Sequence, residues 1–131
     1  MNSIFTKIIK REIPAFIIHE DDLFIAFLDI NPIQKGHTLI VPKTEIDYFF
    51  DIEDDLLSKM LIFTKKIAKA IKKTIECKKI SMSVIGLEVP HAHIHLIPIN
   101  KMSDANFSND PIKMSEEDMH EICMAIKTNI S

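Results

Sequence analysis

The sequence predicts a single α+β domain spanning residues 1–131. We expect an antiparallel sheet of about five strands with its helices packed on one face: one long helix and short N-terminal and C-terminal helices. Three observations lead to this fold class. Apolar residues make up 47% of the chain, which is enough for a buried core. Short β-rich runs follow one another closely, as hairpins require, and only one connection between them is long enough to contain a helix.

The first half of the chain is expected to hold a short helix and three strands. Ser3 is a suitable N-cap for a helix over residues 4–10, whose apolar positions fall on one side. Two β-rich runs, 15–20 and 23–29, flank a pair of aspartates and therefore predict a hairpin. A third apolar run, 38–41, predicts another strand.

The second half of the chain begins with the long helix, expected over 51–75, because apolar residues recur there every three or four positions. These positions are Leu56, Met60, Phe63, Ile67 and Ile71. Acidic residues gather in its first turn and lysines in its last, as the helix dipole favours. Strands are expected over 80–85 and 92–97. The segment 103–131 is expected to be a variable C-terminal loop followed by a helix over 115–127.

Composition excludes several classes of function. The net charge of −3 argues against broad binding of a nucleic-acid backbone. No apolar run approaches the ~20 residues that span a bilayer, so we expect no membrane partner. Two distant cysteines, Cys77 and Cys123, predict neither disulfides nor a cysteine-based metal site, and favour a reducing, cytoplasmic location. Only 2 glycines occur in the chain, which excludes Gly-rich phosphate loops.

Three histidines, His91, His93 and His95, alternate with apolar residues inside one of the predicted strands. Because side chains alternate between the two faces of a strand, the three imidazoles are expected on one face. Such a cluster suits three roles. It can supply a neutral imidazole nucleophile, bind Zn²⁺, or form a polar cluster within the core. We favour the nucleophile, because three buried imidazoles are hard to satisfy with hydrogen bonds in a purely structural cluster.

The residues around these histidines resemble a known family. The triad is followed by two apolar residues, in the run Pro90-His91-Ala92-His93-Ile94-His95-Leu96-Ile97-Pro98. Three upstream blocks have the family's order and spacing: Glu12-Ile13-Pro14-Ala15, Ala26-Phe27-Leu28-Asp29-Ile30, and Gly36-His37 through Leu39-Ile40-Val41-Pro42-Lys43. The sequence therefore resembles the histidine triad (HIT) superfamily, in its Hint-like branch of nucleotide phosphoramidases and hydrolases. The resemblance extends over most of the chain.

This resemblance implies a role for each matching residue. His93 would be the nucleophile that carries the nucleotidyl group, and His95 would contact the phosphate and the leaving group. His91 would orient His93 through its backbone carbonyl, His37 would add a fourth imidazole behind the triad, and Asp29 would bind the ribose hydroxyls. The base pocket would be lined by Ile4, Phe5, Ile13, Phe27 and Ile30. The resemblance also implies a homodimer, with no metal or other cofactor needed for turnover.

The segment before the triad departs from the family pattern. The family has a Gly-rich loop ending in Gly-Gln-Ser or Gly-Gln-Thr, whereas this chain has Gly86-Leu87-Glu88-Val89-Pro90. Backbone N–H groups of residues 86–89 can still bind phosphate oxygens, because they need no particular side chain. A carboxylate at Glu88 would repel phosphate unless it points away or binds a cationic leaving group.

Together these features predict a hydrolase that cleaves a purine nucleoside monophosphate, such as AMP, from an amine through an intermediate on His93. Two alternatives remain open at this point. One is a dinucleoside polyphosphate hydrolase, and the other is a nucleotide- or zinc-binding partner protein with little turnover. Activity is expected to fall below about pH 6, where imidazoles become charged.

Overall fold

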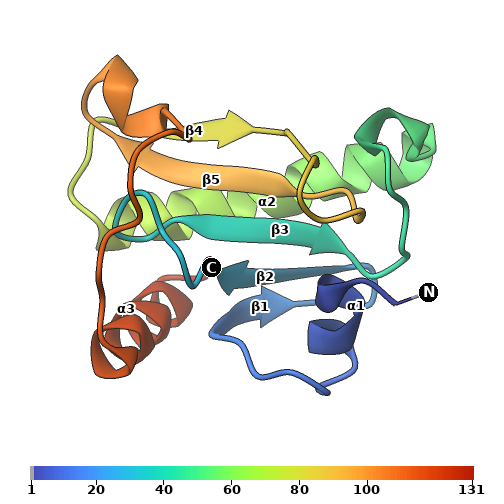
Figure 1. Cartoon of the computed structure of the whole chain (residues 1–131), viewed down its shortest axis with the longest axis horizontal. Coiled ribbons are helices and arrows are strands. Elements are labelled where there is room, and N and C mark those ends of the chain that lie inside the picture. The colour runs from blue at the N-terminus through green and yellow to red at the C-terminus, as the bar shows by residue number, and fades with distance from the viewer. Residues whose placement is uncertain (1) are drawn as a thin grey trace.

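The computed structural model describes residues 2–131 and shows an antiparallel five-stranded sheet in the order β1-β2-β3-β5-β4 (Figure 1). The strands are β1 (Ile17–Glu20), β2 (Phe24–Leu28), β3 (Thr38–Pro42), β4 (Lys79–Ser83) and β5 (Ile94–Ile99). Between neighbouring β3 and β5 the chain makes its one long crossover, through the long helix and β4. The predicted fold class is confirmed.

Three α-helices accompany the sheet: α1 (Ile4–Ile9), α2 (Asp54–Thr74) and α3 (Glu116–Thr128). Ser3 caps α1 by accepting a hydrogen bond from the Thr6 N–H, and Ser115 caps α3 by accepting one from the Asp118 N–H. Two short 3₁₀ helices, η1 (Phe49–Asp51) and η2 (Met102–Ala105), lie in the connections. No helix within residues 2–131 is long and apolar enough to cross a membrane.

The helices lie on both faces of the sheet, whereas the sequence led us to expect them on one. α2 and α3 pack on the face formed by alternate residues of the central strands, including Ala26, Ile40 and Leu96. α1 packs on the opposite face, where Phe5 contacts the side of β2 that carries Phe27 (Figure 1). Every residue of β2 and β3 is buried, so these strands need cover on both faces.

Two element boundaries differ from the prediction in ways that affect the site. The long helix begins at Asp54 rather than residue 51, because η1 comes first and the extended, buried Ile52 separates the two. The last strand, β5, begins at Ile94 rather than residue 92. The residues before it leave the ladder: the Ala92 N–H donates to the carbonyl of Ile46 at 2.6 Å. Two of the three clustered histidines therefore precede the strand.

Candidate active site

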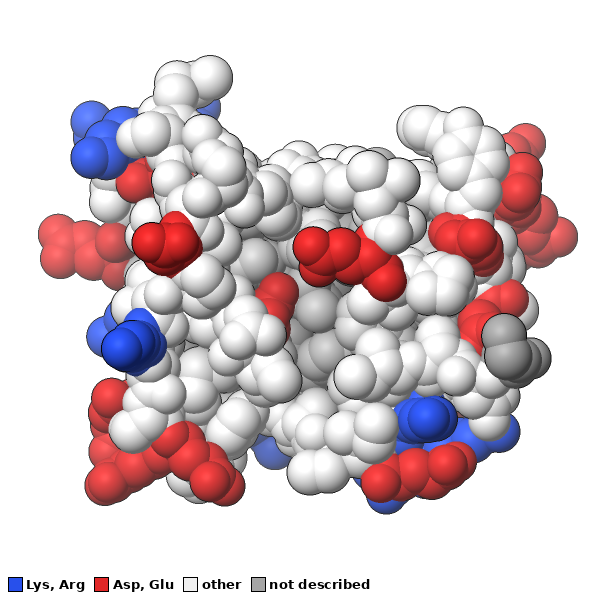
Figure 2. Space-filling view, in the orientation of Figure 1, with Lys and Arg blue, Asp and Glu red and all other residues white. Residues whose placement is uncertain are grey.

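A cavity of about 550 Å³ opens on the α1 face of the sheet. Its walls come from α1, the ends of the central strands, the loop before β5 and the segment after η2. All the residues assigned above to nucleotide binding line it: Ile4, Phe5, Ile13, Phe27, Asp29, Ile30, Gly86, Leu87, Glu88 and Val89. His37, His93 and His95 line it as well. The hollow lies near the middle of the face shown in Figure 2.

The segment after η2 supplies cavity residues that the sequence did not indicate, chiefly Phe107, Asn109 and Pro111. The Phe107 ring meets the His95 ring edge-to-face, with centroids 4.7 Å apart. A backbone hydrogen bond of 2.7 Å from Ile112 to Pro32 holds the segment across the site. Phe107 is a single aromatic residue in a polar stretch, so no periodic pattern marked it.

His93 presents one ring nitrogen to the cavity in a defined protonation state. Its Nδ1 lies 2.7 Å from the backbone carbonyl of His91. A carbonyl can only accept, so we assign the ring proton to Nδ1, which leaves a lone pair on Nε2. The edge-on Phe5 ring, 4.9 Å away between centroids, packs against the imidazole. Burial lowers the pKa of His93, so the ring stays neutral at physiological pH.

His95 is oriented by His37 through a chain of donors and acceptors. The Ile33 N–H donates to Nδ1 of His37 at 3.2 Å, which places the His37 proton on Nε2. That Nε2 lies 2.9 Å from Nδ1 of His95, so His37 donates and His95 accepts. The proton of His95 is therefore on Nε2, the nitrogen left to face the cavity. Burial is the main cause that lowers the pKa of His95 to about 3.

His91 lies on the same side of the sheet as the other two histidines, beside α1, as predicted, but its ring does not line the cavity. The Phe5 ring packs against both His91 and His93, with centroids 5.8 and 4.9 Å apart. Its ring is fully buried beside the N-terminus of α1. Nε2 lies 2.8 Å from the carbonyl of Pro42, and Nδ1 lies 2.7 Å from the Ser3 hydroxyl. The predicted alternation holds although β5 starts only at Ile94, since Ala92, Ile94 and Leu96 all lie in the core on the α2 side. His91 reaches the cavity only through its carbonyl, which binds His93.

Asp29 follows β2 and lines the cavity beside His37. One carboxylate oxygen accepts from the Asn31 N–H at 2.8 Å, and the other lies 3.6 Å from Nε2 of His37. The first contact fixes the rotamer, and the position suits a carboxylate that accepts hydrogen bonds from a sugar diol.

Asp29, His37 and His95 also form the one group of three potential metal ligands within residues 2–131, with ligand atoms within 4.8 Å of one another. The hydrogen bonds do not suit an ion there. Binding through Nε2 of His37 would move its proton to Nδ1, which would then face the Ile33 N–H that it now accepts from. Two N–H groups would then face each other, so these three residues are better arranged for hydrogen bonding than for binding a metal.

Both glycines of the chain lie next to this site in left-handed conformations. Gly36 precedes His37 with φ +90°, and Gly86 begins the loop to the triad with φ +71°. The loop also carries Glu88. Among residues 2–131 only Asp29 and Glu88 are charged residues of the cavity wall, and both are acidic. In Figure 2 acidic side chains lie at the mouth of the hollow, and basic ones lie toward the margins of the face.

Comparison with known proteins places this geometry in a family. The family described as HIT domain matches residues 10–102. An uncharacterized HIT-like protein of Borreliella burgdorferi is 36% identical over 135 residues, covering 97% of each chain. Adenosine 5'-monophosphoramidase HNT1 of Saccharomyces cerevisiae is 43% identical over 96 residues, covering 72% of this chain and 61% of the yeast protein.

A solved structure agrees with these sequence relatives. The Hit-like protein of Bartonella henselae superimposes with a TM-score of 0.85 at 33% identity, over 98% of this chain and 96% of its own. The match covers the sheet, the helices and the segment that carries the clustered histidines. This chain belongs to the HIT domain family.

Proposed function

We propose that this protein is a nucleotide phosphoramidase, which hydrolyses the bond between a nucleoside monophosphate and an amine. The observation that carries the proposal is the pair of assigned tautomers: a lone pair on Nε2 of His93 beside an N–H on Nε2 of His95. The two ring centroids lie 4.8 Å apart, so both nitrogens can act on one phosphoryl group. An adenosine 5'-monophosphoramidase among the relatives supports the same reaction class.

The reaction proceeds in two displacements at phosphorus. In the first, Nε2 of His93 attacks, the P–N bond breaks, and the amine leaves with a proton taken from water, while the Nε2–H of His95 donates a hydrogen bond to a phosphoryl oxygen. In the second, water attacks the nucleotidyl-histidine, the bond to His93 breaks, and the proton of the attacking water is released to solvent. The His91 carbonyl, bound to Nδ1 of His93, stabilises the positive charge that develops on the nucleophilic ring.

The nucleoside is held by the apolar end of the cavity. Phe5, Phe27 and Ile13 offer a surface against which a flat purine base can stack. Asp29 then accepts hydrogen bonds from the ribose hydroxyls. Backbone N–H groups near Gly86 bind the phosphate, because no lysine or arginine within residues 2–131 lines the wall.

The charge of the wall favours an amine over a polyphosphate as the leaving group. Glu88 and Asp29 are acidic, and a departing polyphosphate would bring further negative charge without a cation to balance it. An amine that carries positive charge is instead attracted to Glu88. We therefore prefer the phosphoramidase to the dinucleoside polyphosphate hydrolase.

We also propose that two copies join at the edge strand β4. Met82 and the residues after the strand, Val84 and Ile85, expose apolar side chains beside this unpaired edge. Sedimentation of wild type and Met82→Glu tests this assembly; a monomeric wild type would contradict it.

The activity is tested by measuring AMP release from adenosine phosphoramidate by wild type, His93→Ala and His120→Ala. His120 is exposed on α3 outside the cavity and serves as a matched control. We expect loss of turnover only in His93→Ala. Equal rates in wild type and His93→Ala would overturn the proposal. A higher kcat/KM for diadenosine polyphosphates would replace it with the alternative.

A further inference from the structure

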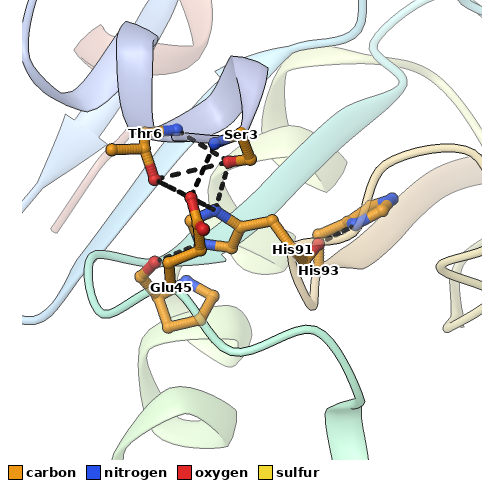
Figure 3. Close-up of polar contacts among 6 residues, drawn as sticks. Ser3, Thr6, Glu45, His91 and His93 are labelled. Carbon is orange, nitrogen blue, oxygen red and sulfur yellow. Dashed lines mark hydrogen bonds and ion pairs between the residues drawn. The ribbon is translucent and has the colours of Figure 1, made fainter. Parts of the chain in front are cut away.

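A compact polar cluster surrounds His91 on the side away from the cavity (Figure 3). Its members are Ser3, Thr6 and Glu45, which come from the start of α1 and from the segment after β3. None of the three lines the cavity. Two of them are 85 and 88 residues away from His91 in the chain, so local sequence gives no reason for the contact.

We infer that Ser3, Thr6 and Glu45 are positioning residues for the nucleophile, acting through His91, in the reaction proposed above. The inference rests on that proposed function for its catalytic readout. Its structural part, the protonation state of two imidazoles, can be measured independently.

The hydrogen bonds determine which atom carries each proton in the cluster. The Ser3 hydroxyl accepts from the Thr6 N–H at 3.0 Å, and Nδ1 of His91 lies 2.7 Å from it. Because Nε2 of His91 lies against a carbonyl, it must be the protonated nitrogen, so Nδ1 must accept from Ser3. The Ser3 hydroxyl therefore fixes the His91 tautomer.

Glu45 holds the donors of this cluster in place. Its Oε1 lies 2.6 Å from the Ser3 N–H and 2.6 Å from the Thr6 hydroxyl, so it accepts from both (Figure 3). These hydrogen bonds, first that from the Ser3 backbone, lower the pKa of Glu45 to about 2. The carboxylate thus stays ionised and ties the first turn of α1 to the chain after β3.

The polar cluster affects the position of the nucleophile, His93, in two ways. With both ring nitrogens of His91 bound, its backbone is fixed, and its carbonyl holds Nδ1 of His93 at 2.7 Å. The same helix carries Phe5, whose ring packs edge-on against His93 at 4.9 Å. Loss of the Ser3 hydroxyl therefore loosens both the hydrogen-bond partner and the wall of the attacking imidazole.

The test compares two serine caps of the same kind. Ser3→Ala removes the cap of α1 together with the bond to His91, whereas Ser115→Ala removes only the cap of α3, and Ser115 does not line the cavity. We expect both variants to melt at a lower temperature than wild type. Only Ser3→Ala should lower kcat, by about 10-fold or more, with KM changed less than about threefold, since misplacing a reacting group mainly affects the chemical step. Ser3→Thr, which keeps the hydroxyl, should restore most of kcat.

Nitrogen-15 NMR of the imidazoles supplies the second readout. In wild type we expect His91 to be protonated on Nε2 and His93 on Nδ1. In Ser3→Ala the His91 signals should shift toward exchange between the two tautomers. Ser115→Ala should keep the wild-type pattern. The inference is overturned if Ser3→Ala retains the kcat of Ser115→Ala, or if its imidazole signals match wild type. If wild type shows no phosphoramidase activity, the proposed function fails and the NMR comparison alone decides the inference.

Discussion

The two glycines beside the active site predict a contrast in stability that can be worked from the structure. Both have positive φ, so alanine at either position takes on a left-handed conformation that costs about 1–2 kcal/mol. Replacing glycine also restricts the unfolded chain, which offsets about 0.4–1 kcal/mol. At Gly86 a new Cβ meets no atom within 4 Å, so Gly86→Ala should lower the free energy of unfolding by at most about 1.6 kcal/mol.

Gly36 has no such room. A Cβ there would lie 3.0 Å from Cγ1 of Ile75 and 3.4 Å from Cγ of Pro98. Overpacking of this kind costs about 1–3 kcal/mol in addition to the cost of the left-handed backbone conformation. Gly36→Ala should therefore lower the free energy of unfolding by about 1–4.6 kcal/mol. It should also disturb the neighbouring His37, which binds His95.

Urea unfolding of wild type, Gly36→Ala and Gly86→Ala measures this difference, and nucleotide affinity is measured on the same samples. We expect Gly86→Ala to weaken nucleotide binding more than stability, because the loop must place its N–H groups at the phosphate. Equal destabilisation by the two variants would refute the packing argument. Unchanged nucleotide affinity in Gly86→Ala would show that this glycine only forms a turn.

Three further predictions follow from charge, burial and packing. Burial lowers the pKa values of His37, His93 and His95, so below about pH 6.5 the unfolded chain binds more protons than the folded one. In urea titrations the free energy of unfolding should hence be constant above that pH and fall below it. Activity should persist below about pH 6, the point at which unperturbed imidazoles would lose it by becoming charged. Glu88→Lys should raise kcat/KM for diadenosine polyphosphates relative to phosphoramidates in a competition assay; an unchanged ratio would contradict the charge argument. Phe107→Ala should raise KM severalfold and lower stability by less than the 3–5 kcal/mol of a fully buried phenylalanine, since Phe107 is 36% exposed; an unchanged KM would remove Phe107 from the binding site.

Local sequence patterns predicted most of the fold. The serine caps at Ser3 and Ser115 begin α1 and α3, and the apolar stripe of the long helix faces the sheet. Boundaries were predicted less well where long-range contacts decide them. β5 starts two residues late because the Ala92 N–H bonds to Ile46 in a distant connection, which no local pattern reveals.

The same distinction holds for the site. Residues within the blocks that resemble the HIT family, such as Phe27 and Asp29, line the cavity as expected. The three histidines lie on one side as predicted, but no local pattern showed that the ring of His91 binds Ser3 and Pro42 and does not line the cavity. Phe107 and Glu45 come close to the site only because the chain folds back on itself. Neither belongs to a periodic pattern that could have marked it.

The central claim is that Nε2 of His93 forms a covalent bond to the nucleotide phosphorus. Rapid quenching of wild type with adenosine phosphoramidate at alkaline pH, followed by mass spectrometry of the peptides, tests it most directly. We predict an adenylyl group on the peptide that contains His93, with the group located on that histidine, and none in His93→Ala. Full turnover without an adduct, or an adduct on another residue, would contradict the account.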